Sequence, residues 1–432
     1  MVDMKRFICR VSNNLLFLSL LKKANSILFS LLATVIIHHL LTPEQKGEYA
    51  YIQNIVVILT TILNMGINLV LPSYVRKKNE WTLSTFYVLI ISQFLLNCIF
   101  SVLFGIVLQS WQCFLYGLAV ACGVLSLQTL NCTLIYNFKA TVLANIVGII
   151  MNVIILFIAL LFNFNNIDII FVAVIAKELL CGAICYFAVA KNIHTNEVNY
   201  REWPKIVATG IMPMLTSLLS ILNYKVDILE VKWLGVSEYD IGIYSVGLGL
   251  AEYVLLMTDV FKDVLFHKTA QNDNIEYVNR SLRLCSTVLI VAYVAVIAFG
   301  KIIIRIIYGT PYLESYGVMI IVVLGTFSMM FFKLLGTLFV AQGKWYFYFF
   351  TLLGSVIINI ASNIILIPII GIYGSALTSL LSYSFAGIIF IVKYLKSYNL
   401  NLKEVIWICP ADMQEMRRFV STIKQTFSQK SN

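Results

Sequence analysis

This chain is too apolar for a soluble globular protein. Of its 432 residues, 60% are hydrophobic and 12% are charged, whereas about a quarter of the residues in soluble domains are charged. The net charge of +10 does not indicate a nucleic-acid partner, because the basic residues lie in short links and a tail.

The chain consists mainly of long apolar segments separated by short polar links. A helix of about 20 apolar residues is long enough to cross the roughly 30 Å hydrocarbon layer of a membrane. We therefore predict an all-α polytopic membrane protein with about twelve transmembrane helices. In chain order the predicted spans are 15–41, 49–72, 84–108, 113–135, 142–162, 168–190, 206–232, 241–266, 284–308, 314–340, 345–369 and 372–392.

Two polar segments outside these spans have their own patterns. Residues 272–283 mix apolar and charged side chains, which predicts a short amphipathic helix on the membrane surface. Residues 397–432 are polar and contain too short an apolar stretch for a further span.

Basic residues alternate between the links. The N-terminal segment, every second link and the tail contain 21 of the 31 Lys and Arg residues, whereas the opposite links contain only Lys46. Cytoplasmic links of membrane proteins are enriched in Lys and Arg. The alternation therefore predicts that both termini lie in the cytoplasm.

The two halves of the chain repeat one another. Residues 41–49 and 234–244 are short acidic links that end in Gly-x-Tyr, and residues 152–156 and 363–367 each join an Asn to an aliphatic run. Six spans per half is an even number, so both halves start on the same side of the membrane. This predicts MATE-like parallel repeats around a cavity, with an N-terminal lobe (1–205), a C-terminal lobe (206–396) and a cytoplasmic tail (397–432).

Residues 353–383 resemble the penultimate spans of oligosaccharide flippases, the Wzx-type branch of the MOP exporter superfamily. In that family an N-x-x-L-N-x-x-L-I-P pattern precedes G-x-x-G-A-A and a further span. Residues 40–53, 242–254 and 301–315 are similar to other stretches of the family, in the expected order. The matching positions in the first stretch are Asn359, Asn363, Pro368, Gly371, Gly374 and Ala376.

The resemblance implies a function. Flippases of this type carry polyprenyl-diphosphate-linked oligosaccharides across the bacterial cytoplasmic membrane by alternating access, for surface polysaccharide biosynthesis. The implied partners are the lipid-linked oligosaccharide, membrane lipids, H⁺ or Na⁺ as a coupling ion, and other membrane proteins of polysaccharide assembly.

Ionisable residues inside spans are the candidate site residues, because each costs about 2.5–3.5 kcal/mol to insert. Lysines in a partly dry cavity would attract a diphosphate strongly, and the candidates are Lys177, Lys225 and Lys333. Carboxylates at depth can bind a proton or Na⁺, and the candidates are Asp227, Glu230, Glu252 and Asp259.

Helix geometry groups these side chains. Asn223, Asp227 and Glu230 follow i, i+4, i+7 spacing and form one stripe, whereas Lys225 points elsewhere. We expect this stripe, and a second one through Glu252, to face the cavity between the lobes. The alternative is structural: Lys177 with a carboxylate of a neighbouring span, or Lys225 with Glu252, would form neutralising pairs that fix helix packing.

Two other functions compete with the flippase. A cation-coupled multidrug exporter of the same superfamily would keep the fold, but it predicts an acid-rich N-terminal lobe, and the first span contains no acid. A membrane polymerase or ligase would need a large external loop with paired Arg residues, which the sequence lacks. We predict no catalytic residues, no metal site and no cofactor, because the four His do not lie at ligand spacing.

Overall fold

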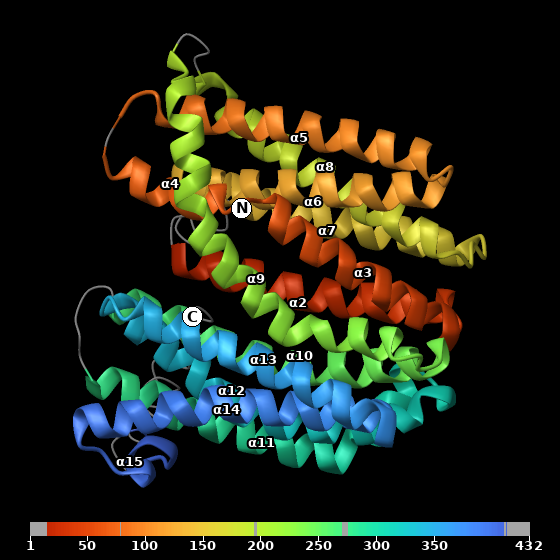
Figure 1. Cartoon of the computed structure of the whole chain (residues 1–432), viewed down its shortest axis with the longest axis vertical. Coiled ribbons are helices and arrows are strands. Elements are labelled where there is room, and N and C mark those ends of the chain that lie inside the picture. The colour runs from red at the N-terminus through yellow and green to blue at the C-terminus, as the bar shows by residue number, and fades with distance from the viewer. Residues whose placement is uncertain (1–14, 78, 194–196, 270–274, 410–411, 413–432) are drawn as a thin grey trace, which may run out of the picture. The chain divides into compact units, whose positions relative to one another are not determined.

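The computed structural model describes residues 15–77, 79–193, 197–269, 275–409 and 412 (Figure 1). These residues form helices and contain no β-strand. The long helices are α2 (Leu15–Leu40), α3 (Pro43–Leu63), α4 (Ile67–Val75), α5 (Thr82–Val107), α6 (Trp111–Tyr136), α7 (Phe138–Leu161), α8 (Ile167–Val189), α9 (Trp203–Trp233), α10 (Glu238–Thr269), α11 (Ile275–Ile307), α12 (Ser315–Ala341), α13 (Trp345–Ile370) and α14 (Ile372–Tyr398). The short ones are η1 (Ala190–Asn192), η3 (Tyr200–Glu202), η4 (Thr310–Glu314) and α15 (Leu402–Ile406).

The predicted fold class is confirmed. Among the described residues, 11 helical stretches are long and apolar enough to cross a membrane, with α3 and α4 counted as one. The described apolar part of α2, Asn25–Leu40, is shorter. Each of the twelve predicted spans falls on one of these helices, so the chain is a polytopic all-α membrane protein.

The prediction of a surface helix at residues 272–283 is wrong. Residues 275–283 are instead the first turns of α11, which continues without a break to Ile307, and residues 272–274 lie outside the described residues. The reason is a continuous apolar stripe: Val278, Leu282, Cys285 and Leu289 are all fully buried and follow helical spacing.

Contacts divide the chain into two compact units, Met1–Leu222 and Asn223–Asn432, called here the N-terminal and C-terminal units. Helix α9 begins in the first unit and ends in the second. The lobe boundary predicted after residue 205 lies near the start of this helix and remains a prediction.

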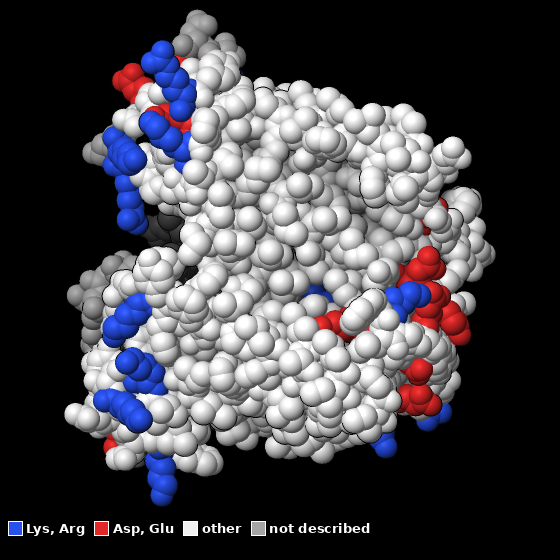
Figure 2. Space-filling model, in the orientation of Figure 1, with Lys and Arg blue, Asp and Glu red and all other residues white. Residues whose placement is uncertain are grey.

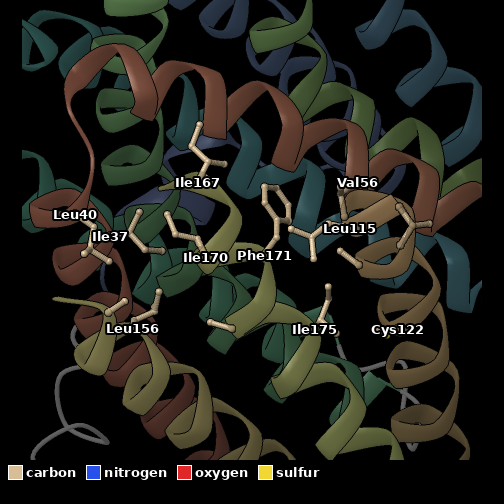
Figure 3. Packing of buried hydrophobic residues seen from close by; sticks show 14 of the residues in the cluster. Ile37, Leu40, Val56, Leu115, Cys122, Leu156, Ile167, Ile170, Phe171 and Ile175 are labelled. Carbon is tan, nitrogen blue, oxygen red and sulfur yellow. The ribbon is translucent and has the colours of Figure 1, made fainter. Parts of the chain in front are cut away.

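In the N-terminal unit, α6 is the central helix and packs against α3, α5, α7 and α8. Its core is a cluster of apolar side chains from α2, α3, α6, α7 and α8 (Figure 3). Phe171 of α8 lies at the middle of this cluster, with its ring 4.6 Å from that of Tyr116 and 5.7 Å from that of Tyr49. Burial of these side chains from solvent positions the helices.

One span of the N-terminal unit is broken. Helix α3 ends at Leu63, Met65 and Gly66 adopt positive φ angles, and α4 starts at Ile67. Two carbonyls at the break accept hydrogen bonds from buried glutamines: Gln93 Nε2 donates to Leu63 O, and Gln128 Nε2 donates to Asn64 O at 3.1 Å, which also accepts from Ile67 N at 3.2 Å. Non-helical backbone at membrane depth is tolerated only when such partners are present.

A close backbone contact stabilises the same break. A Cβ atom on Gly66 would lie 2.2 Å from Gly210 O, and a Cβ on Gly210 would lie 2.2 Å from Met65 O. Only glycine at both positions lets α9 approach the break this closely.

The C-terminal unit repeats the packing order of the first. Helix α12 is central and packs against α10, α11 and α14, as α6 packs against α3, α5 and α8. Helix α13 packs on α14, as α7 packs on α8. On the face shown in Figure 2, Lys and Arg side chains gather at the left end of the helices of each unit, and the C-terminal unit carries further ones at the right-hand end, beside Asp and Glu. This distribution agrees with the alternation of charge along the sequence, while the side on which the termini lie remains a prediction.

Candidate functional site

The stripe on α9 is a buried set of polar side chains in the C-terminal unit. Asn223 and Asp227 are 0% exposed and Glu230 is 8% exposed. Their i, i+4, i+7 spacing places them on one face of the helix, as predicted. Lys225 lies off this face and binds a residue of α10, also as predicted.

Asp227 is enclosed by three other helices of its own unit. Its carboxylate accepts hydrogen bonds from Tyr244 Oη of α10 at 3.0 Å, from Asn363 Nδ2 of α13 at 3.1 Å, and from Ser379 Oγ of α14. The expectation that this stripe faces a cavity between the lobes is therefore wrong for Asp227. The hydroxyl and amide donors on α10, α13 and α14 draw the carboxylate into the interior of the unit instead.

Glu230 joins the same site through Asn363. The Asn363 Nδ2 atom donates to Glu230 and Asp227, and it also lies 3.2 Å from Asn359 Oδ1. An amide nitrogen has only two hydrogens, so it cannot satisfy three acceptors at once. The Oδ1 atom of Asn363 has no hydrogen-bond partner and is buried. The site therefore has more oxygen atoms than donors.

The two carboxylates have no positively charged partner. No ammonium, guanidinium or imidazole group of the described residues lies within 4 Å of Asp227 or Glu230. Burying a carboxylate without a cation is costly, so such a group takes up a proton or a metal ion. We call this set of residues (Asp227, Glu230, Asn363, Tyr244 and Ser379) the carboxylate site.

Further hydrogen bonds hold the helices around the carboxylate site. Ser355 Oγ lies 2.9 Å from Asn223 Oδ1 and donates to Ser382 O at 2.8 Å, which ties α9, α13 and α14 together. The roles of Tyr244, Asn363 and Ser379 were not predicted from the sequence. A signal was present: α13 carries two Asn residues four positions apart, and α14 carries several Ser residues on one face of an apolar helix.

Both predicted lysines of the C-terminal unit form ion pairs. Lys225 Nζ lies 2.6 Å from Glu252 Oε1, and Lys333 Nζ lies 3.0 Å from each oxygen of Asp259. Lys262 Nζ also lies 3.6 Å from Asp259. The alternative that Lys225 pairs with Glu252 is therefore correct.

These pairs belong to one cluster. Lys333 Nζ lies 5.5 Å from the ring centre of Tyr224, the residue before Lys225. The side chains of Lys225 and Glu252 are 28% and 33% exposed, and those of Lys333 and Asp259 are 14% and 22% exposed. The lysine cluster (Lys225, Lys262, Lys333, Glu252 and Asp259) is thus half-buried and contains one more cation than anion.

Lys177 lies apart from this cluster, in the N-terminal unit. Its Nζ atom is 2.7 Å from Oε1 of Glu178, the next residue of α8. The alternative that pairs Lys177 with a carboxylate of a neighbouring span is therefore wrong, because its partner is the next residue of its own helix. The described residues contain no group of three or more His, Cys, Asp or Glu side chains that could hold a metal ion.

Comparison with known proteins gives a family match and a fold match. Residues 36–317 match the model of a family described as "Polysaccharide biosynthesis protein". The search of curated protein sequences finds no match.

Solved structures similar to this chain come from two kinds of membrane protein. An inward-facing multidrug resistance MATE family transporter of the MOP superfamily has a TM-score of 0.66 at 11% identity, over 87% of this chain and 95% of that chain. The lipid II flippase MurJ, in an inward closed conformation, has a TM-score of 0.62 at 18% identity, over 89% of each chain. A mutant of the Vibrio cholerae MATE transporter VcmN has a TM-score of 0.58 at 14% identity, over 92% of this chain and 99% of that chain. At these identities the likeness shows the fold alone.

Proposed function

Because this chain belongs to the polysaccharide biosynthesis protein family, we propose that it moves polyprenyl-diphosphate-linked oligosaccharides across the bacterial cytoplasmic membrane. The predicted resemblance to the Wzx-type branch of the MOP superfamily is confirmed by the family match together with the fold. The family and the structural neighbours are transporters and flippases, not enzymes. The oligosaccharide cargo, alternating access and two cytoplasmic termini are parts of the proposal.

A lipid-linked cargo has support from the neighbours. One of the similar structures is a flippase of lipid II, which is itself a lipid-linked molecule. A flippase of this kind must shelter a polar headgroup while the lipid chain stays in the bilayer. The half-buried charges of the C-terminal unit are suited to that task.

The carboxylate site is proposed to bind the coupling ion, H⁺ or Na⁺. The observation that carries this proposal is the burial of Asp227 and Glu230 without any described cation within 4 Å. All the groups around them offer oxygen atoms or O–H and N–H donors, which suits a proton or a hard cation. A bound cation would let Asn363 turn its oxygen toward the carboxylates and relieve the surplus of acceptors.

The lysine cluster is proposed to bind the diphosphate. Lys225 and Lys333 form ion pairs with Glu252 and Asp259, and Lys262 supplies the surplus positive charge. In a half-buried site this charge is weakly screened and attracts an anionic headgroup. Lys177 offers the same chemistry in the N-terminal unit, but Glu178 neutralises it locally. Glu252 and Asp259 are therefore proposed to position lysines rather than to bind the ion.

Transport in proteoliposomes tests the proposal. The full chain would be reconstituted with a fluorescent polyprenyl-diphosphate oligosaccharide, and transfer between leaflets would be measured with and without a Na⁺ or pH gradient. Asp227→Asn removes the charge that binds the ion, so gradient-driven transport should fall at least about tenfold, or about 1.4 kcal/mol.

Glu314→Gln is the matched control, because Glu314 is an exposed carboxylate of the same unit. It should leave transport unchanged. Full gradient response in both Asp227→Asn and Glu230→Gln would remove the carboxylate site from coupling. Absence of lipid-linked transfer in the wild type would remove the flippase function itself.

A cation-coupled multidrug exporter is the second candidate function. It has support from the MATE transporter among the similar structures, which is named for multidrug resistance. Ion binding at the carboxylate site is compatible with both functions, so the flippase and the exporter differ only in the substrate that they transport. Efflux of small organic cations without transfer of lipid-linked sugar would favour the exporter.

A further inference from the structure

A pocket in the N-terminal unit has no role in the transport scheme above. It lies where α4, α5 and α9 end or begin, so it is at the level where these spans leave the membrane. Its volume is about 520 Å³, within the range of about 300–1,000 Å³ that small-molecule sites occupy. The side chains that matter for its chemistry are Tyr74, Lys77, Asn79, Trp81, Glu202 and Lys205.

Two aromatic rings form one wall of the pocket. Tyr74 is buried and its ring lies 6.1 Å from that of Trp81, at an interplanar angle of 70°. Phe86, which is fully buried, lies 5.6 Å behind Tyr74 and holds it in place. A rigid aromatic wall of this kind offers flat apolar surface to a ligand that also needs polar contacts.

Charged side chains lie directly beside this aromatic wall. Lys77 is exposed, and its Nζ atom lies 4.7 Å from the ring centre of Tyr74. No carboxylate of the described residues lies within 4 Å of this ammonium group. Lys205 Nζ lies 2.7 Å from Glu202 Oε1, so this second lysine is already neutralised. The pocket therefore has one uncompensated positive charge, at Lys77.

Glu202 limits which anions the pocket can take. Its carboxylate also accepts a long hydrogen bond of 3.5 Å from Tyr74 Oη, which fixes it in the wall. A carboxylate repels a bare phosphate but accepts hydrogen bonds from hydroxyl groups. Asn79 adds an amide that can both donate and accept. The wall thus combines a cation for phosphate, acceptors for hydroxyls and aromatic surface for a sugar ring.

We propose that this pocket binds the sugar-phosphate headgroup of a lipid before that lipid is carried across the membrane. The proposal rests on the flippase function, and it adds a headgroup site in the N-terminal unit that is separate from the lysine cluster. An anionic phospholipid such as phosphatidylglycerol shares the phosphate chemistry but has no sugar ring to cover Tyr74 and Trp81.

Photolabelling of the full chain tests this site directly. The probe is farnesyl diphosphate carrying one N-acetylhexosamine and a photoreactive group on the sugar, added to the chain in phosphatidylcholine nanodiscs. Mass spectrometry then measures labelling of the peptides that contain residues 74–81 and 202–209. Lys77→Gln should reduce this labelling about fivefold, and Trp81→Ala should reduce it at least as much.

Two variants of the same unit serve as matched controls. Lys191→Gln removes an exposed lysine outside the pocket, and Trp111→Ala removes an exposed tryptophan from the start of α6. Both should be labelled like the wild type. Lys77 is an exposed side chain, so Lys77→Gln stays informative even if Trp81→Ala fails to fold.

Competition identifies the source of the headgroup. Excess unlabelled sugar-bearing farnesyl diphosphate should abolish the labelling, whereas farnesyl diphosphate alone or phosphatidylglycerol should compete weakly. Equal competition by phosphatidylglycerol, or labelling that Lys77→Gln does not change, would overturn the proposal. Wild-type transport without any labelling of the pocket would overturn it too, and would leave the flippase function standing. Asp227→Asn should be labelled like the wild type, which separates this site from the coupling ion.

Discussion

The two units use the same helix packing around different buried chemistry. Helix α6 in the N-terminal unit and α12 in the C-terminal unit have corresponding neighbours. The N-terminal unit buries neutral amides, with Gln93, Gln128 and Asn64 in one hydrogen-bonded group. The C-terminal unit buries carboxylates, with Asp227 fully enclosed.

The difference follows from what each kind of group requires. An amide supplies both donors and acceptors, so neighbouring amides can bond to one another and to the carbonyls of the broken α3–α4 span, although Asn64 Oδ1 and Gln128 Oε1 are buried without a partner among the described residues. A carboxylate only accepts, and two of them also carry negative charge that a proton or a cation would balance. Under the proposed function, the same arrangement of helices therefore serves as a fixed unit in one half and as an ion-binding unit in the other.

Gln128→Glu tests this difference most strongly, because it places an acid in the buried amide group of the N-terminal unit. Gln128 Nε2 donates to Asn64 O and to Gln93 Oε1, and a glutamate there would place its oxygens against two acceptors. A buried carboxylate is costly unless a cation balances its charge, so we expect a loss of stability of about 3 kcal/mol or more. Thermal unfolding of the chain in detergent measures this loss.

Gln128→Met is the matched control, since it removes the donors without adding charge. Leaving Gln93 Oε1 without its donor, while Asn64 O keeps the hydrogen bond from Ile67 N, should cost about 1–3 kcal/mol, which is less than the cost of the glutamate. An N-terminal unit that accepted Gln128→Glu with no loss of stability would show that buried acids are tolerated in both units. The two units would then not differ in whether they tolerate a buried acid such as Asp227.

Substitutions of Lys225 test whether this charge of the C-terminal unit binds the diphosphate or only stabilises helix packing. Lys225→Met leaves Glu252 without its partner, and the double variant with Glu252→Gln removes the pair altogether. If Lys225 binds the diphosphate, both variants should transport lipid-linked sugar about fivefold more slowly, or about 1 kcal/mol for a half-exposed charge. The measurement is the proteoliposome transfer rate.

Lys232→Met is the matched control, because Lys232 is on the same helix and pairs with Glu238 at a similar exposure. It should leave the rate unchanged. Recovery of the full rate in the Lys225→Met/Glu252→Gln double variant would mean that the pair only fixes helix packing.

The sequence predicted the spans well because each depends on local composition. Runs of about 20 apolar residues have one stable form in a membrane, and every predicted run falls on a helix. The break at residues 64–66 was missed because the apolar run passes straight through it. Only Gln93, Gln128 and Gly210, which come from other helices, show that the backbone can leave the helix there.

The carboxylate site was predicted less completely than the spans, because it depends on contacts between different helices. Spacing along α9 was enough to place Asp227 and Glu230 on one face, and the pairing of Lys225 with Glu252 was one of two alternatives. Spacing within one helix could not show which helices face that stripe, so Tyr244 and Ser379 were missed and a cavity was expected instead. Residues that meet from four helices are determined by tertiary packing, which a single sequence does not reveal.

The two units also differ in the exposure of an ion pair near the ends of their helices. Of the changes considered, breaking the buried pair of the C-terminal unit should have the smallest effect. In the N-terminal unit the Lys205–Glu202 pair is open to solvent, with the lysine side chain 68% exposed. In the C-terminal unit Arg283 and Asp412 are 7% and 3% exposed, and Arg283 donates from Nε to Asp412 at 2.6 Å and from Nη2 at 3.0 Å. Arg283 Nη1 also donates to Glu404 O at 3.2 Å, so this pair fastens α15 to the start of α11.

The pH dependence of this contact follows from Asp412. Burial tends to raise the pKa of Asp412, but hydrogen bonds from Arg283 and Cys409 outweigh it and lower the pKa to about 2. A carboxyl with a lowered pKa stabilises the folded state above its unfolded pKa of about 3.9, and this stabilisation is lost as the pH falls toward 2.

Amide hydrogen exchange over residues 402–409 should therefore show equal protection at pH 7 and pH 5. Asp412→Asn should speed this exchange about fivefold at pH 7, or about 1 kcal/mol, because Arg283 keeps Glu276 as an ion-pair partner and Glu404 O as an acceptor. Lys403→Met, an exposed change on the same helix, should have no effect. Equal exchange in Asp412→Asn and the wild type would mean that apolar packing of Val405, which is fully buried, holds α15 without the ion pair.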